Sequence, residues 1–69
     1  MSPDKLAYMA NQIGKFFVAQ PHDDAVAGIA DHIAKFWDPR MRAGILAHLA
    51  EVTLDPPVRA AVERMKSAG

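Results

Sequence analysis

The sequence predicts an all-α fold, a small irregular bundle of about four short helices that forms a single domain over residues 1–69. Apolar residues recur at helical rather than alternating spacing, and runs of β-branched residues are absent. Four residue–proline pairs divide the chain into segments of helical length. These pairs are Ser2-Pro3, Gln20-Pro21, Asp38-Pro39 and Asp55-Pro56. Proline fits the first turn of a helix and disrupts its interior, so each pair marks a helix start.

The first helix is expected from Pro3 to Ala19. When each residue turns the helix by about 100°, one face collects most of the apolar side chains. This stripe consists of Leu6, Met9, Ala10, Ile13, Phe16 and Phe17. Tyr8 and Val18 lie off the stripe, so Tyr8 is expected either to be a singly exposed aromatic residue or to contact a partner.

The second helix is expected to begin near His22 or Asp23, where Asp23 and Asp24 complement the positive end of the helix dipole. Its stripe consists of Val26, Ile29, Ala30, Ile33, Phe36 and Trp37. This pattern repeats that of residues 6–17 about 20 residues later. Duplication would explain the repeat, but convergence of similar amphipathic helices is the simpler interpretation, because the period is short for a helical repeat.

The third helix is expected from Asp38 to about Val52. Pro39 disfavours helical geometry at Asp38, whose carboxylate can accept hydrogen bonds from the first turn. The helix has a broad apolar arc, formed by Met41, Ile45, Leu46, Leu49, Ala50 and Val52. Arg42 lies within this arc, so it either pairs with Asp38 four residues earlier or reaches an acidic group on a partner.

The fourth helix follows a link through Thr53 and Leu54. Asp55 is expected to cap it, with Pro56 and Pro57 in the first turn. Its apolar stripe is narrow and consists of Val58, Ala61, Val62 and Met65. Its solvent face is predicted to hold Arg59, Glu63, Arg64 and Lys66.

The composition argues against several classes of function. The chain has no cysteine, which excludes disulfides, thiolate metal sites and thiol nucleophiles. Eight acidic and eight basic residues give zero net charge, which disfavours nucleic-acid binding by bulk electrostatics. No signal peptide is evident, and no apolar run approaches the roughly 20 residues that span a bilayer. Because 51% of the residues are apolar in so short a chain, we expect some apolar surface to face another protein.

No catalytic or metal-binding pattern is present. His22, His32 and His48 do not have the spacing of metal ligands on a helix, and the Glu-x-x-His pairs of metal-binding bundles are absent. The alternative function is a helix-turn-helix DNA-binding or regulatory module, in which Arg40 and Arg42 would open the recognition helix. The zero net charge and the apolar third helix argue against it.

Three segments together resemble the delta subunit of NAD-dependent formate dehydrogenases. They are Lys5–Ile13, Ala25–Ile33 and Lys35–Arg42, and the likeness extends from about Lys5 to Arg64. The run Phe-Trp-Asp-Pro-Arg-Met-Arg, which begins at Phe36, is its most specific part.

The resemblance implies a cytoplasmic multi-subunit enzyme that oxidises formate to carbon dioxide with NAD as acceptor. Its large catalytic subunit would carry a molybdenum or tungsten bis-pterin cofactor, and iron–sulfur clusters and FMN would complete the electron path. The delta-like chain would hold no cofactor or metal. It would bind the large subunit and support assembly, cofactor insertion or stability of the complex.

The expected partner-binding residues are Trp37, Arg40 and Arg42, followed by Tyr8. Large aromatic and arginine side chains contribute most to the affinity of protein interfaces. Trp37 also lies on the apolar stripe, so a role in the core is the alternative for this residue. Self-association of the isolated chain stays open.

Overall fold

The computed structural model describes residues 2–20 and 24–68. Within these ranges it contains four helices and no strand: α1 (Pro3–Val18), α2 (Ala25–Phe36), α3 (Pro39–Ala47) and α4 (Pro56–Ala68). The predicted all-α fold with four helices is confirmed.

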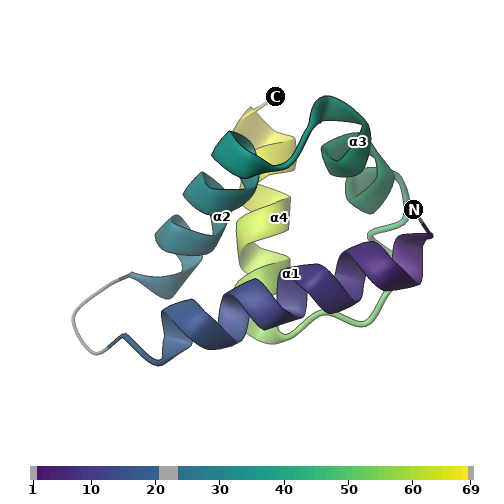
Figure 1. Cartoon of the computed structure of the whole chain (residues 1–69). Coiled ribbons are helices and arrows are strands. Elements are labelled where there is room, and N and C mark those ends of the chain that lie inside the picture. The colour runs from purple at the N-terminus through teal and green to yellow at the C-terminus, as the bar shows by residue number, and fades with distance from the viewer. Residues whose placement is uncertain (1, 21–23, 69) are drawn as a thin grey trace.

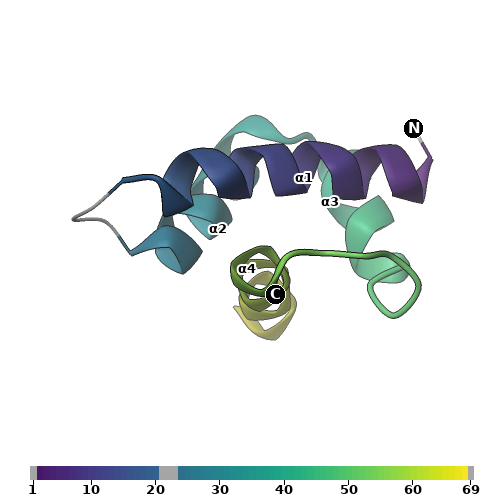
Figure 2. The same ribbon diagram turned by 90° about the horizontal axis from the view of Figure 1, so that it is seen from below.

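The longest helix, α1, organises the bundle. It packs against the other three helices, while α2 packs against α4 and α3 packs against both α1 and α4. Figure 1 shows α1 running across one end of α2 and α4, with α3 near its N-terminal half. The view from below in Figure 2 shows α1 crossing α4, whose axis points toward the viewer. The helices therefore form an irregular bundle rather than a parallel array.

A close approach fixes the crossing of α1 and α4. Gly14 is buried, and a β-carbon built at this position would overlap the Cγ2 methyl of Val58, which is itself fully buried. The missing side chain lets the α1 backbone rest directly on α4, as glycine does wherever a backbone must come close to a neighbour.

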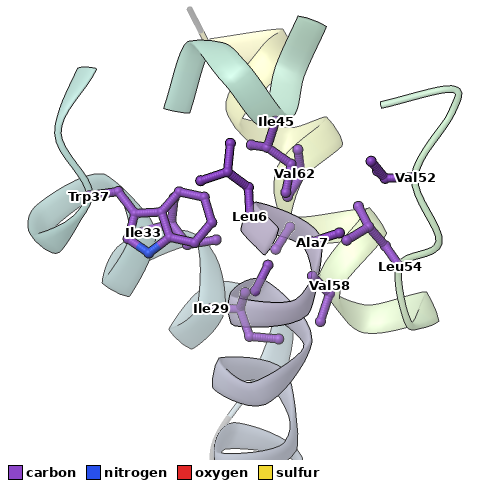
Figure 3. Close-up of a cluster of buried hydrophobic side chains, with 12 residues drawn as sticks. Leu6, Ala7, Ile29, Ile33, Trp37, Ile45, Val52, Leu54, Val58 and Val62 are labelled. Atoms are coloured by element: carbon purple, nitrogen blue, oxygen red, sulfur yellow. The ribbon is translucent and has the colours of Figure 1, made fainter. Parts of the chain in front are cut away.

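The core is one apolar cluster to which all four helices and the link between α3 and α4 contribute (Figure 3). Its buried members are Leu6, Ala7, Ala10, Ile29, Ile33, Trp37, Ile45, Val52, Leu54, Val58, Ala61 and Val62. Figure 3 shows the Trp37 indole turned into this cluster beside Ile33. No buried side-chain nitrogen or oxygen within the described ranges lacks a hydrogen-bond partner. The centre of the bundle is therefore purely apolar.

The start of α1 matches the prediction, and its end lies one residue before the expected Ala19. The Ser2 hydroxyl accepts a hydrogen bond from the Lys5 N–H at 3.2 Å, and Ala19 is the C-cap residue. The predicted stripe is largely correct, with one exception. Phe16 was expected to pack inward, but 62% of its surface is exposed.

The predicted start of α2 is too early. The helix begins at Ala25, and Asp24 acts as its N-cap by accepting from the Ala27 N–H at 3.2 Å. The predicted start residues themselves, His22 and Asp23, lie outside the described residues. Asp24 has extended backbone angles, which is the conformation that an N-cap residue requires, so the helix starts after it.

The predicted end of α3 is wrong. The helix stops at Ala47 instead of Val52, and the chain then turns so that the Glu51 and Val52 N–H groups both donate to the His48 carbonyl. This turn brings Val52 into the core from the link, while Ala50, expected on the apolar arc, is exposed. Burial of the link residues therefore takes precedence over continuing the helical pattern.

The predicted solvent face of α4 is wrong at Arg59. The Arg59 guanidinium is partly buried and donates to the carbonyls of Leu49 and Val52, at 3.0 and 2.9 Å. These bonds hold the turn that follows α3. The predicted stripe of α4 is confirmed, since Val58, Ala61 and Val62 are buried and Met65 packs against them.

Asn11 on α1 fixes the link from the other side. Its side-chain amide donates to the Thr53 carbonyl at 3.1 Å and accepts from the Asp55 N–H at 2.9 Å. The Asp55 carboxylate, predicted to cap α4, lies 3.9 Å from the Lys15 ammonium. The link between α3 and α4 is thus tied to α1 by two hydrogen bonds and one ion pair.

Candidate partner interface

The part of the chain that the structure describes offers no grouping for metal chemistry. Within it, no three histidine or acidic side chains converge in a way that could hold a metal ion. His48 Nδ1 lies 2.6 Å from Glu51 Oε2, and both side chains are at the surface. None of the described helices is long and apolar enough to cross a membrane.

Four rings form a row that starts on the C-terminal half of α1 and continues along α2 to its last residue, and we call them the aromatic patch: Phe16, Phe17, His32 and Phe36. Their centroids form a continuous chain of contacts. Phe16 and Phe17 are 5.3 Å apart, Phe17 and His32 are 6.0 Å apart, and His32 and Phe36 are 4.7 Å apart. Such edge and tilted arrangements are the ones that aromatic pairs prefer. The patch is an ordered surface feature built by two helices.

The patch leaves two large apolar side chains exposed to solvent. Phe16 is 62% exposed and Phe36 is 72% exposed. A shallow hollow of about 270 Å³ lies beside Phe16, lined by Ile13, Phe16, Phe17 and His32. Burying a phenylalanine side chain fully is worth about 1.5–3 kcal/mol, and these two rings forgo most of that gain in the isolated chain. Two exposed phenylalanine rings at the ends of one row of ring contacts indicate a contact surface.

The end of α2 explains why Phe36 faces outward. Pro39 disfavours helical geometry at Asp38, so the helix stops at Phe36. Trp37 then takes extended angles (φ −85°, ψ 140°), and its side chain enters the core. Phe36 was predicted to lie on the buried stripe, and this prediction is wrong: the Trp37 side chain, which follows the last helical residue, enters the core, and Phe36 stays exposed.

The repeat seen in the sequence has a structural counterpart at the patch. Phe16-Phe17 and Phe36-Trp37 occupy corresponding positions near the ends of α1 and α2. In each pair the first ring is exposed and the second packs against the core. The two exposed rings thus arise from the same local pattern.

The patch itself carries no carboxylate, ammonium or guanidinium group. The charges nearest to it in sequence are paired within the chain, as Asp31 with Lys35 at 3.0 Å and Lys15 with Asp55 at 3.9 Å. An apolar surface without charge of its own fits an apolar counterpart.

The structure places the four sequence-predicted partner residues in different environments. Trp37 is only 5% exposed and lies in the core, which is the alternative that its stripe position allowed. Tyr8 is 65% exposed on α1 and belongs to none of the ring contacts of the patch. Arg40 is exposed in the first turn of α3, beside a hollow of about 330 Å³. Burial therefore separates Trp37 from the exposed Tyr8 and Arg40.

Arg42 has a role that the sequence did not reveal. Its Nη1 donates to the carbonyls of Ala34 and Trp37, at 3.0 and 2.5 Å, and so closes the C-terminal end of α2. The expected pair with Asp38 is not what the structure shows. The Asp38 carboxylate instead accepts from the Met41 N–H at 2.8 Å. With Arg42 bonded to α2, the helix-turn-helix alternative loses one of its two recognition arginines.

Asp38 is therefore predicted to act as a helix cap. Replacing it with asparagine should change the free energy of unfolding by less than about 0.5 kcal/mol, because asparagine caps about as well as aspartate. Replacing it with alanine should cost about 0.5–2 kcal/mol, since the Met41 N–H loses its acceptor. Urea denaturation followed by circular dichroism measures both changes. Equal losses for the two variants would mean that the charge of Asp38 matters more than its capping oxygen.

Sequence reasoning missed Phe16, Phe36 and His32 as members of a surface. A helical wheel placed both phenylalanines on buried stripes, and His32 was considered only as a metal ligand. The one available signal was the repeated pair of adjacent aromatic residues, because neighbouring positions on a helix differ by about 100° and one ring of such a pair lies at the margin of the apolar stripe or beyond it.

Comparison with known proteins identifies one family. A family model described as NADH-dependent formate dehydrogenase delta subunit FdsD matches residues 5–62, which is well over half of the chain. No curated protein and no solved structure gives a significant match. The matched range contains the whole aromatic patch and all four residues predicted to bind a partner.

Proposed function

The chain belongs to the FdsD family of NADH-dependent formate dehydrogenase delta subunits, and on this premise we propose that it is a non-catalytic accessory subunit of such an enzyme in the cytoplasm. Its proposed partner is the large catalytic subunit, which oxidises formate to carbon dioxide with NAD as acceptor. Binding would support assembly of the complex, insertion of its cofactor or its stability.

The family match is the observation that carries this proposal. The aromatic patch supports it physically, because a subunit of a complex needs a surface that gains free energy on contact. Phe16 and Phe36 provide such a surface without being needed in the core.

The redox groups of the complex are proposed to reside in the partner subunits. Iron–sulfur clusters are held by cysteine thiolates, and this chain has no cysteine. The donor set of this chain therefore does not fit such a cluster. The molybdenum or tungsten bis-pterin cofactor and FMN are assigned to the partners on the same proposal, and no electron-transfer step passes through this chain.

The proposal is tested by co-purification. The tagged full-length chain is expressed together with the large catalytic subunit, and the eluate is analysed by mass spectrometry, metal content and formate-dependent NAD reduction. We expect a stable complex that contains molybdenum or tungsten, and lower metal content or activity when this chain is omitted. A large subunit that is equally metallated, active and stable without this chain, and does not co-elute with it, would refute the accessory role.

A further inference from the structure

We infer that the aromatic patch is the docking surface of this chain, and that its occupant is an uncharged, apolar concavity on the larger subunit that receives the Phe16 and Phe36 rings. The inference deepens the proposed function and rests on it. It moves the interface away from Trp37, Arg40 and Arg42 to the row of rings on α1 and α2.

The two exposed rings, Phe16 and Phe36, are held in place before any partner binds. Phe17 lies against Gly28 of α2, where an added β-carbon would come within 2.6 Å of its ring. Phe17 supports Phe16 through the edge contact at 5.3 Å, and His32 supports Phe36 at 4.7 Å. Side chains that are already ordered lose less conformational entropy on binding, so they act as efficient anchors.

The exposed area of the patch favours a larger partner over a second copy of the chain. An aromatic side chain offers about 150–250 Å², so Phe16 and Phe36, at 62% and 72% exposure, present roughly 200–330 Å² together. A stable interface needs about 800 Å² from each partner. Two copies that meet through this patch fall far short of that area. A larger chain that encloses the rings can also contact the flanks of α1 and α2 and reach it.

The charge of the patch indicates the chemistry of the partner surface. The patch has no carboxylate, ammonium or guanidinium group, and Asp31 and Lys35 on α2 form an ion pair with each other at 3.0 Å. The matching surface of the partner is therefore apolar at its centre. Binding through it should depend little on salt, whereas anchors such as Arg40 would give an affinity that falls as ionic strength rises.

The experiment measures binding of the full-length chain to the immobilised large subunit. The test variant carries Phe16→Ala with Phe36→Ala. The control carries Arg64→Ala with Lys66→Ala, which removes two exposed side chains on α4 that lie outside the patch. We expect Kd to rise at least about 30-fold for the test variant, the effect of removing an interface hot spot, and less than about threefold for the control. Affinity of the unmodified chain should change less than about threefold between low and high salt.

Several outcomes separate the inference from the proposed function. If the unmodified chain does not bind the large subunit, the proposed function fails, and the inference fails with it. If the unmodified chain and the test variant bind equally well, the docking surface is wrong while the proposed function stands. Greater loss in the control, or strong weakening by salt, also overturns the inference.

Two further measurements keep the test decisive. Circular dichroism checks the fold of the double variant, and if that variant is unfolded, Phe36→Ala alone replaces it with an expected loss of about tenfold. Unchanged affinity of that single variant overturns the inference. Sedimentation of the unmodified chain should show a monomer at micromolar concentration, and a dimer that the double variant dissociates would assign the patch to a second copy instead.

Discussion

The variant Trp37→Ala should be largely unfolded as an isolated chain. Trp37 is 5% exposed and packs in the centre of the core cluster. Truncating a buried tryptophan to alanine costs about 3–5 kcal/mol. A core of this size usually supplies only about 3–5 kcal/mol in total, so the loss is comparable to the whole stability of the chain. Far-UV circular dichroism at 25 °C, with a urea titration, measures the folded fraction.

The adjacent residue provides a matched control. Phe36→Ala removes a ring of similar size that is 72% exposed, so its effect on the free energy of unfolding should stay within about 0.5 kcal/mol. The comparison isolates burial, because both residues are aromatic and only one position apart. A Trp37→Ala chain that melts like the unmodified one, yet fails to bind the large subunit, would contradict the core assignment and restore Trp37 as an anchor.

The variant Arg42→Ala should lower the free energy of unfolding by about 1.5–3 kcal/mol. The partly buried guanidinium donates to the Ala34 and Trp37 carbonyls. Hydrogen bonds to charged groups contribute about this much, and a cation at the C-terminal end of a helix also interacts favourably with the helix dipole. Urea denaturation, analysed as a two-state transition, measures the change.

Arg40→Ala is the control for this prediction. Arg40 lies two residues earlier in the same helix and is exposed, so its removal should change stability by less than about 0.5 kcal/mol. Arg42→Lys should recover only part of the loss, because an ammonium group lacks the planar geometry of the guanidinium. Equal effects of Arg40→Ala and Arg42→Ala would show that the two carbonyl bonds contribute nothing specific.

Where each helix starts and stops could be predicted only when the signal was local. The start of α1 at Pro3 and of α3 at Pro39 follow from a capping side chain followed directly by proline. The end of α3 depends on Arg59, which lies 10 residues after Leu49 and belongs to the next helix. A contact of this kind is set by packing, and the periodicity of one segment does not contain it.

The partner surface was harder to predict for the same reason. Tyr8 was expected off the apolar stripe and is exposed, since a mid-helix position follows the helical period. Phe36 was expected on the buried stripe and is exposed, whereas Trp37 was expected as a partner contact, with the core as its alternative, and is buried. The helix ends between these two residues. Which of the two rings faces the core then depends on the backbone angles of Trp37. Those angles arise because the helix ends before Pro39.

Arg42 and Arg59 also set the order in which segments of the chain complete their folding during synthesis. Arg42 bonds to carbonyls five and eight residues behind it, and Arg59 bonds to carbonyls seven and ten residues behind it. Because the ribosome releases the chain from its N-terminus, the last turn of α2 waits for the first turn of α3, and the turn after α3 waits for α4. Each segment of the nascent chain is completed only by its successor, so the bundle can close only when α4 has emerged.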